Sequence, residues 1–111
     1  MNGYVNSLDE VSLILLLKII STGKATVNSI ERTLRHCCGN LDYLDGSEFY
    51  FSGSVPFLLN ELSDHGLLEE KIINNKQNYV LTQKSENLLK ENEKEAEFYI
   101  GMRFNDLLGV Q

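Results

Sequence analysis

Residues 54–89 read SVPFLLNELSDHGLLEEKIINNKQNYVLTQKSENLL, and this stretch decides the fold class. Ser54 is a residue type that caps helices, and Pro56 suits the first turn of the helix that follows. His65 and Gly66 mark its end, because glycine readily adopts the left-handed conformation that closes many helices. We therefore predict a helix between Ser54 and Gly66. Its buried face is expected to comprise Phe57, Leu58, Leu59 and Leu62.

A β-hairpin is predicted directly after this helix. Leu67–Ile73 reads as one strand, the polar residues 74–77 as a turn, and 78–82 as the returning strand. Tyr79 and Leu81 share one face of the second strand, since side chains alternate along a strand. This face is expected to lie on the core.

Two further helices are predicted upstream. Ser7 and Glu10 have the spacing of a capping box, and the apolar run that follows predicts a helix over about residues 8–21. This helix is apolar nearly all round, so we expect it to be buried on more than one side. Thr26 is expected to cap a second helix over about residues 27–38.

The stretch between the second and third helices has mixed signals. Residues 39–53 combine turn-forming residues with aromatic ones. Residues 48–52 are compatible with either a short strand or a packed loop. We expect the aromatic side chains to bury against the core rather than to enclose a ligand.

Thr82 is predicted to cap a last helix over about residues 83–107, either unbroken or bent near Gly101. Its apolar stripe is longer than a small core would be expected to cover, which favours a homodimer built on this helix. The alternative is that the helix folds back on the first helix within one chain. The candidate interface residues are Leu89, Ala96, Tyr99, Ile100, Phe104, Leu107 and Leu108.

The order of helices, hairpin and last helix resembles that of PadR-like and MarR-like regulators of bacteria and archaea. The matching positions are Leu58, Leu59, Leu62, Gly66 and Leu67, then Tyr79, Leu81, Thr82, Lys84, Leu88 and Leu89. The resemblance implies a winged helix-turn-helix, which is a mainly α domain with a small β-hairpin wing and a long C-terminal helix that pairs subunits. One domain would span residues 1–111, with the first three helices and the wing in 8–82 and the dimerisation helix in 83–108. Ser85 stands where these families usually have a glycine.

Such a fold implies a homodimeric transcriptional regulator that binds double-stranded operator DNA. The third helix would enter the major groove, where Asn60 could read an adenine and Ser54 could hold a phosphate. The wing tip would contact the backbone or the minor groove. The candidate DNA-binding residues are Arg32, Arg35, Ser54, Asn60, Lys71, Asn74, Asn75, Lys76, Gln77 and Lys84.

The charge balance keeps a second interpretation open. Ten Lys and Arg against sixteen Asp and Glu give a net charge of −6. DNA-binding domains usually present a basic face, yet no Lys or Arg lies between Ser54 and Gly66. The alternative is an acidic winged-helix module that binds a protein instead, such as a phage or plasmid accessory factor or a subunit of a complex.

No motif predicts catalysis, a cofactor or a metal. The chain has no P-loop, no G-x-G-x-x-G and no legible Ser/His/Asp grouping, so we do not expect an enzyme. His36, Cys37 and Cys38 are adjacent and lack the C-x2-C spacing of zinc sites. Cys37 suits a small core residue, while a redox-sensing cysteine pair stays open. The few cysteines, the lack of a secretory h-region and the short apolar run Leu13–Ile20 predict a cytoplasmic protein with no membrane partner.

Overall fold

The computed structural model describes residues 10–38 and 54–109. The predicted capping box at Ser7 and the predicted strand or loop at 48–52 lie outside these residues. The elements in chain order are α1 (Glu10–Ser21), α2 (Val27–Cys38), α3 (Val55–Asp64), β1 (Leu68–Ile73), β2 (Lys76–Leu81), α4 (Gln83–Ile100) and α5 (Phe104–Leu108). The prediction of a mainly α chain with a small antiparallel hairpin and a C-terminal helix is confirmed.

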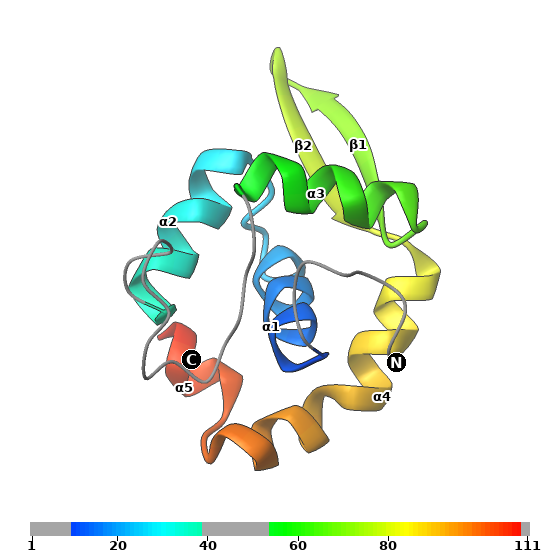
Figure 1. The fold of residues 1–111 in the computed structure, drawn as a ribbon. Helices are drawn as coiled ribbons and strands as arrows, with labels where there is room; N and C mark the ends of the chain where they lie inside the picture. Colours follow the sequence, from blue (N-terminus) through cyan, green and yellow to red (C-terminus); the bar gives the residue numbers. More distant parts are fainter. Residues whose placement is uncertain (1–9, 39–53, 110–111) are drawn as a thin grey trace.

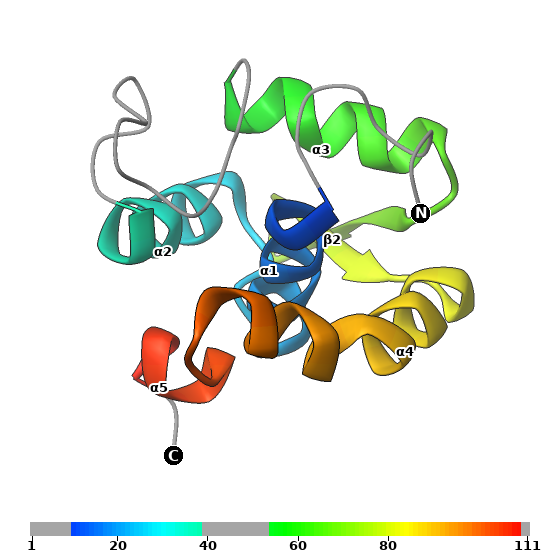
Figure 2. The same cartoon turned by 60° about the horizontal axis from the view of Figure 1, so that its bottom comes forward.

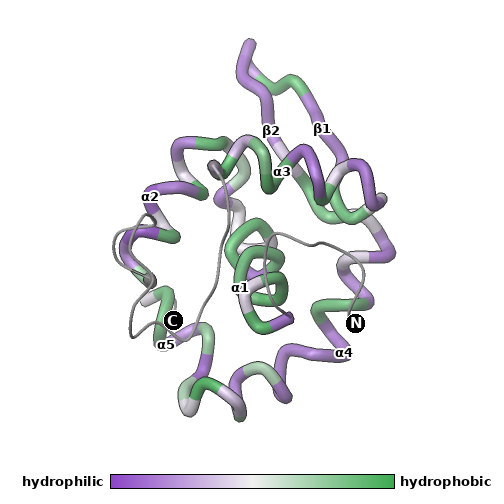
Figure 3. Tube along the Cα trace, in the orientation of Figure 1, coloured by the Kyte–Doolittle hydropathy of each residue, from purple (hydrophilic) through white to green (hydrophobic). Residues whose placement is uncertain are grey.

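Helix α1 forms the centre of the molecule. Figures 1 and 2 show it between α3 and α4, with the other helices around it. In Figure 1 the hairpin projects beyond α3. Its sequence is apolar on nearly every face, as the hydropathy colouring in Figure 3 shows. Accordingly, every residue from Ser12 to Ile20 except Lys18 is buried. The expectation of a first helix buried on more than one side is confirmed.

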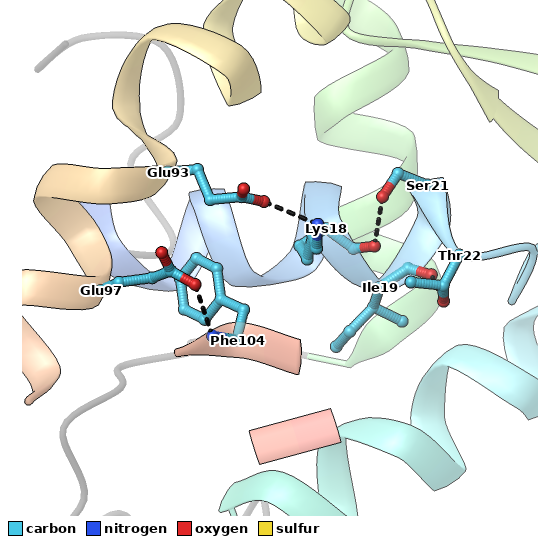
Figure 4. A network of polar contacts seen from close by, with 7 residues as sticks. All are labelled: Lys18, Ile19, Ser21, Thr22, Glu93, Glu97 and Phe104. Carbon is cyan, nitrogen blue, oxygen red and sulfur yellow. Dashed lines mark hydrogen bonds and ion pairs between the residues drawn. The ribbon is translucent and has the colours of Figure 1, made fainter. Parts of the chain in front are cut away.

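Lys18 is the only charged residue within the buried part of α1, and α4 supplies its partner. The Lys18 ammonium lies 2.8 Å from a Glu93 carboxylate oxygen, and the two side chains are only 19% and 30% exposed (Figure 4). A partly buried charge needs such a partner, because its desolvation is otherwise uncompensated. The pair therefore favours one alignment of α4 on α1.

Hydroxyl side chains begin three of the helices. At α2, the Ser29 amide donates to Thr26 Oγ1 and the Thr26 amide donates to Ser29 Oγ, both at 3.2 Å. At α3, Ser54 Oγ accepts from the Phe57 amide at 3.3 Å. These contacts satisfy amides that have no partner within the helix. The predicted caps at Thr26 and Ser54 are confirmed.

Helix α4 begins with a reciprocal capping box. The Ser85 amide donates to Thr82 Oγ1 at 3.3 Å, and the Thr82 amide donates to Ser85 Oγ at 2.9 Å. The predicted cap at Thr82 is confirmed. Ser85 therefore supplies a side-chain acceptor that glycine, the usual residue of the resembled families here, lacks.

The hairpin turn is shorter than predicted. Asn74 and Asn75 alone form the turn, with φ of 52° and 64°, while Lys76 and Gln77 already belong to β2. A two-residue hairpin loop of this kind needs positive φ at both positions, which asparagine tolerates better than most residues. The strands pair from Leu68 with Leu81 to Ile73 with Lys76, so β1 begins one residue later than predicted.

Helix α3 buries a different set of residues from the one predicted. Val55, Leu58, Leu59 and Leu62 are buried, whereas Phe57 is 53% exposed. The buried residues have the spacing of a single helical stripe, and Phe57 falls beside it. The prediction was therefore wrong for Phe57, and Val55 takes its place.

The last predicted helix is interrupted at Gly101. This glycine has a φ of 78°, and the chain then turns into α5. The Phe104 amide donates to Glu97 Oε2 at 2.7 Å (Figure 4), and its ring is fully buried against the core. Of the two predicted alternatives, the structure has the bent form.

Two phenylalanines near the C-terminus test this packing. Phe104→Ala should lower the free energy of unfolding by about 3–5 kcal/mol, because it leaves a cavity in the core. Phe98→Ala is the matched control, since Phe98 is 89% exposed. Urea denaturation followed by circular dichroism measures both. An equal and small effect of the two substitutions would show that α5 does not pack as described.

Candidate nucleic-acid interface

Hydrogen bonds join the end of helix α3 to the hairpin connection and to the start of α4. The chain leaves α3 through Gly66, with φ of 75°, and the Leu67 amide donates to Leu62 O at 2.9 Å. Thr82 Oγ1 donates to Gly66 O at 2.7 Å. Lys84 Nζ donates to His65 O at 3.1 Å. The two carbonyls that directly follow α3 thus accept hydrogen bonds from residues at the start of α4.

The hairpin has an inner and an outer face. Leu68, Tyr79 and Leu81 share the face toward the core, with Tyr79 only 3% exposed. Because side chains alternate, Lys71 and Lys76 both lie on the other face. Both lysines are exposed, so this outer face is the most basic part of the hairpin.

Strand β2 is also bonded to the connection between α1 and α2. The Tyr79 amide donates to Ala25 O at 2.8 Å, which ties the inner half of the hairpin to the body. Burial raises the pKa of the Tyr79 hydroxyl, and the carboxylate of Glu70, its cross-strand partner, raises it further. The inner half of the hairpin is therefore anchored, while its tip stands clear of the helices (Figure 1).

All ten predicted DNA-binding residues are exposed, but three of them already make contacts within the chain. Ser54 Oγ caps α3, and Lys84 holds the end of the same helix. Arg35 pairs with Glu31 at 3.2 Å on the surface of α2. The remaining seven are Arg32, Asn60, Lys71, Asn74, Asn75, Lys76 and Gln77.

The surface around α3 and the hairpin is mixed rather than basic. Residues 54–82 contain two lysines and four acidic residues. At the tip of the hairpin, four of the turn and strand residues are uncharged. Sequence reasoning missed three exposed apolar side chains here: Phe57 at 53%, Ile72 at 72% and Ile73 at 48% exposure. Alternation was a usable signal for Ile73 alone, because Ile72 lies on the same face of the hairpin as Leu68 and Tyr79.

Most of the predicted dimer-interface residues are used within the chain. Leu89, Ala96 and Phe104 are buried, and Ile100, Leu107 and Leu108 pack against the core from its edge. Only Tyr99 is largely exposed, at 68%. The argument that this stripe exceeds what the chain's own core can cover therefore does not hold. A homodimer itself stays a prediction.

The sequence cluster of His36, Cys37 and Cys38 forms no metal or redox site within the described residues. Cys37 is half-buried, and its Sγ donates to Leu107 O at 3.9 Å. Burial raises the pKa of the Cys37 thiol. The side chain of Cys38 lies outside the described part of the structure, so the redox pair stays a prediction. Within residues 10–38 and 54–109, no group of three or more His, Cys, Asp or Glu is placed to hold a metal ion.

The chain was compared with family models, curated proteins and solved structures. No family model, curated protein or solved structure matches the chain significantly. None of the helices in the described ranges is long and apolar enough to span a membrane.

The buried tyrosine of the hairpin predicts a pH dependence of stability. The folded-state pKa of Tyr79 lies above the unfolded value of about 10, so its stabilising effect is present below that pH and is lost as pH rises through the folded pKa. The free energy of unfolding should fall more steeply above about pH 10 in the wild type than in Tyr79→Phe. Glu70→Gln should reduce the slope, and identical slopes in all three proteins would contradict the assignment. Urea titrations at stepped pH measure it.

Proposed function

We propose that this chain is a winged-helix regulator that binds double-stranded DNA, with α3 as the recognition helix and the hairpin as the wing. The observation that carries the proposal is the anchored hairpin beside α3, whose tip projects beyond the helices with Lys71 and Lys76 on one face. A projecting, polar loop with paired cations suits contact with phosphates at the edge of a groove.

The proposed base contact comes from α3. Asn60 is exposed, and an asparagine side chain can form a bidentate pair with adenine in the major groove. Exposed Arg32 on α2 would supply a further phosphate contact. The connection between α2 and α3 runs from residue 39 to 54, so the motif would differ from a helix-turn-helix with the usual short turn.

A homodimer belongs to this proposal, because two subunits would present two recognition helices to successive major grooves. Tyr99 is the remaining exposed candidate among the predicted contact residues, and its neighbours Phe98 and Met102 are 89% and 43% exposed. These three side chains near the end of α4 are the apolar surface on which a second copy would pack.

A protein-binding module is the second candidate, and the exposed apolar side chains favour it. Phe57 on α3 and the isoleucines of β1 cannot form hydrogen bonds or ion pairs with a phosphate backbone. Exposed apolar side chains on an acidic surface instead suit a protein partner. The two candidates use different residues of the same region, so substitutions can separate them.

The first prediction concerns DNA affinity. Purified protein should bind a fluorescent duplex from the region upstream of its own gene, and affinity should fall between about 50 and 200 mM salt. Lys76→Gln should weaken binding to all sequences alike and reduce the salt slope by about 1. Lys94→Gln is the matched control, since Lys94 is an exposed lysine of α4. Fluorescence anisotropy measures affinity, and light scattering gives the number of subunits.

The second prediction concerns sequence preference. Asn60→Ala should lose discrimination worth about 1–3 kcal/mol at one base pair while keeping most of the non-specific affinity. Ile72→Ser should leave DNA binding unchanged. If the wild type does not bind DNA even at low salt, the DNA proposal is wrong. In that case Ile72→Ser should be the substitution that disrupts a partner complex.

A further inference from the structure

We propose that a recess between the end of α1, strand β2 and the N-terminal part of α4 binds an amino-acid-like zwitterion with a large apolar side chain. The recess has a volume of about 580 Å³, which lies within the range of pockets that hold small molecules. Its lining includes none of the side chains that the proposed DNA, protein and subunit contacts use. The proposal therefore does not depend on any of those interactions.

Two contacts within the chain join the walls of the recess. The Tyr79 amide donates to Ala25 O at 2.8 Å, which holds β2 against the connection that follows α1. Lys18 of α1 and Glu93 of α4 form their ion pair at 2.8 Å (Figure 4). All four residues line the recess, so the chain's own contacts hold three elements around it.

Apolar side chains from every wall form part of the lining. They are Ile20, Ala25, Tyr79, Leu81 and Leu89. An apolar ligand group placed against them leaves water, which is favourable roughly in proportion to the area that it buries. The ligand is therefore expected to carry a hydrocarbon or aromatic side chain.

The charged residues that line the recess balance one another. They are two lysines, Lys18 and Lys90, and two glutamates, Glu86 and Glu93. Lys18 and Glu93 pair with each other, which leaves the carboxylate of Glu86 and the ammonium of Lys90. A simple anion would be repelled by Glu86 and a simple cation by Lys90, whereas a zwitterion can pair with both.

Glu86 and Lys90 have the spacing of a helical ion pair but do not form one. They occupy exposed positions four residues apart on α4, where glutamate and lysine often pair directly. In the part of the chain that the structure describes, neither side chain has an ion-pair or hydrogen-bond partner. Their Cβ atoms are about 5–6 Å apart at this spacing. The ammonium of an α-amino acid can therefore pair with Glu86 while its carboxylate pairs with Lys90.

L-phenylalanine and its blocked forms test the proposal, because they share one side chain and differ in charge. In an amide NMR titration of the full chain, L-phenylalanine should cause saturable shifts of residues 79–81 and 86–93. N-acetyl-L-phenylalanine lacks the ammonium and L-phenylalaninamide lacks the carboxylate, so each should bind about threefold more weakly. N-acetyl-L-phenylalaninamide lacks both charges and should bind about tenfold more weakly. Glycine keeps both charges without the side chain and should cause no saturable shift.

Three outcomes of this titration would overturn the proposal. The first is that L-phenylalanine causes no saturable shift up to its solubility limit. The second is equal affinity for the uncharged N-acetyl-L-phenylalaninamide, which would mean adsorption to apolar surface alone. The third is tighter binding of one singly charged form than of L-phenylalanine, which would make the recess a site for a simple anion or a simple cation.

Two substitutions assign each charge of the ligand to its partner. Lys90→Gln should weaken binding of L-phenylalanine and N-acetyl-L-phenylalanine about threefold and leave L-phenylalaninamide unchanged, because only the first two have a carboxylate. Glu86→Gln should weaken binding of L-phenylalanine and L-phenylalaninamide and leave N-acetyl-L-phenylalanine unchanged. Lys94→Gln and Glu91→Gln are the matched controls, since both residues are exposed on α4 and do not line the recess. Losses that are equal for all three ligands, or that the controls reproduce, would reduce the effect to net charge and contradict the proposal.

Discussion

The burial of α1 on every side is the constraint on which the rest of the structure depends. A helix whose apolar residues run from Leu13 to Ile20 cannot lie on a surface, so other elements must cover all of its faces. Helices α2 and α4, strand β2 and the short α5 all contact it. The break at Gly101 follows from the same need, because a straight continuation of α4 would carry Phe104 away from the core that it completes.

The ion pair between Lys18 and Glu93 favours one position of α4 along α1. Apolar packing tolerates small shifts of one helix along another, whereas the pairing of one partly buried ammonium with one carboxylate favours a single alignment. At its N-terminus, α4 is held by the Thr82 and Ser85 capping box and by the contact of Thr82 with Gly66. Helix α4 is therefore the element that links the end of α3 to the far side of the core.

Local signals made much of this fold predictable from the sequence. Thr26, Ser54 and Thr82 cap their helices through contacts with residues three positions away, and Gly66 and Gly101 end theirs by adopting positive φ. The packing partner of an apolar stripe is harder to predict than a helix cap, because periodicity identifies the apolar face of a helix but not the element that packs against it. That is why Phe57 was assigned to the core, and why Leu89, Ala96 and Phe104 were assigned to a second subunit. The candidate site was predictable only as a set of exposed residues, since their partners within the chain, such as Glu31 for Arg35, depend on side-chain geometry.

The charge distribution bears directly on the proposed DNA interface. Around α3 and the hairpin, acids outnumber lysines, so attraction to DNA would have to come from the few cations on the outer face of the hairpin and on α2 rather than from the domain as a whole. A local field of this kind is compatible with an acidic protein, because screening limits the reach of distant charges to roughly 10 Å in ordinary salt.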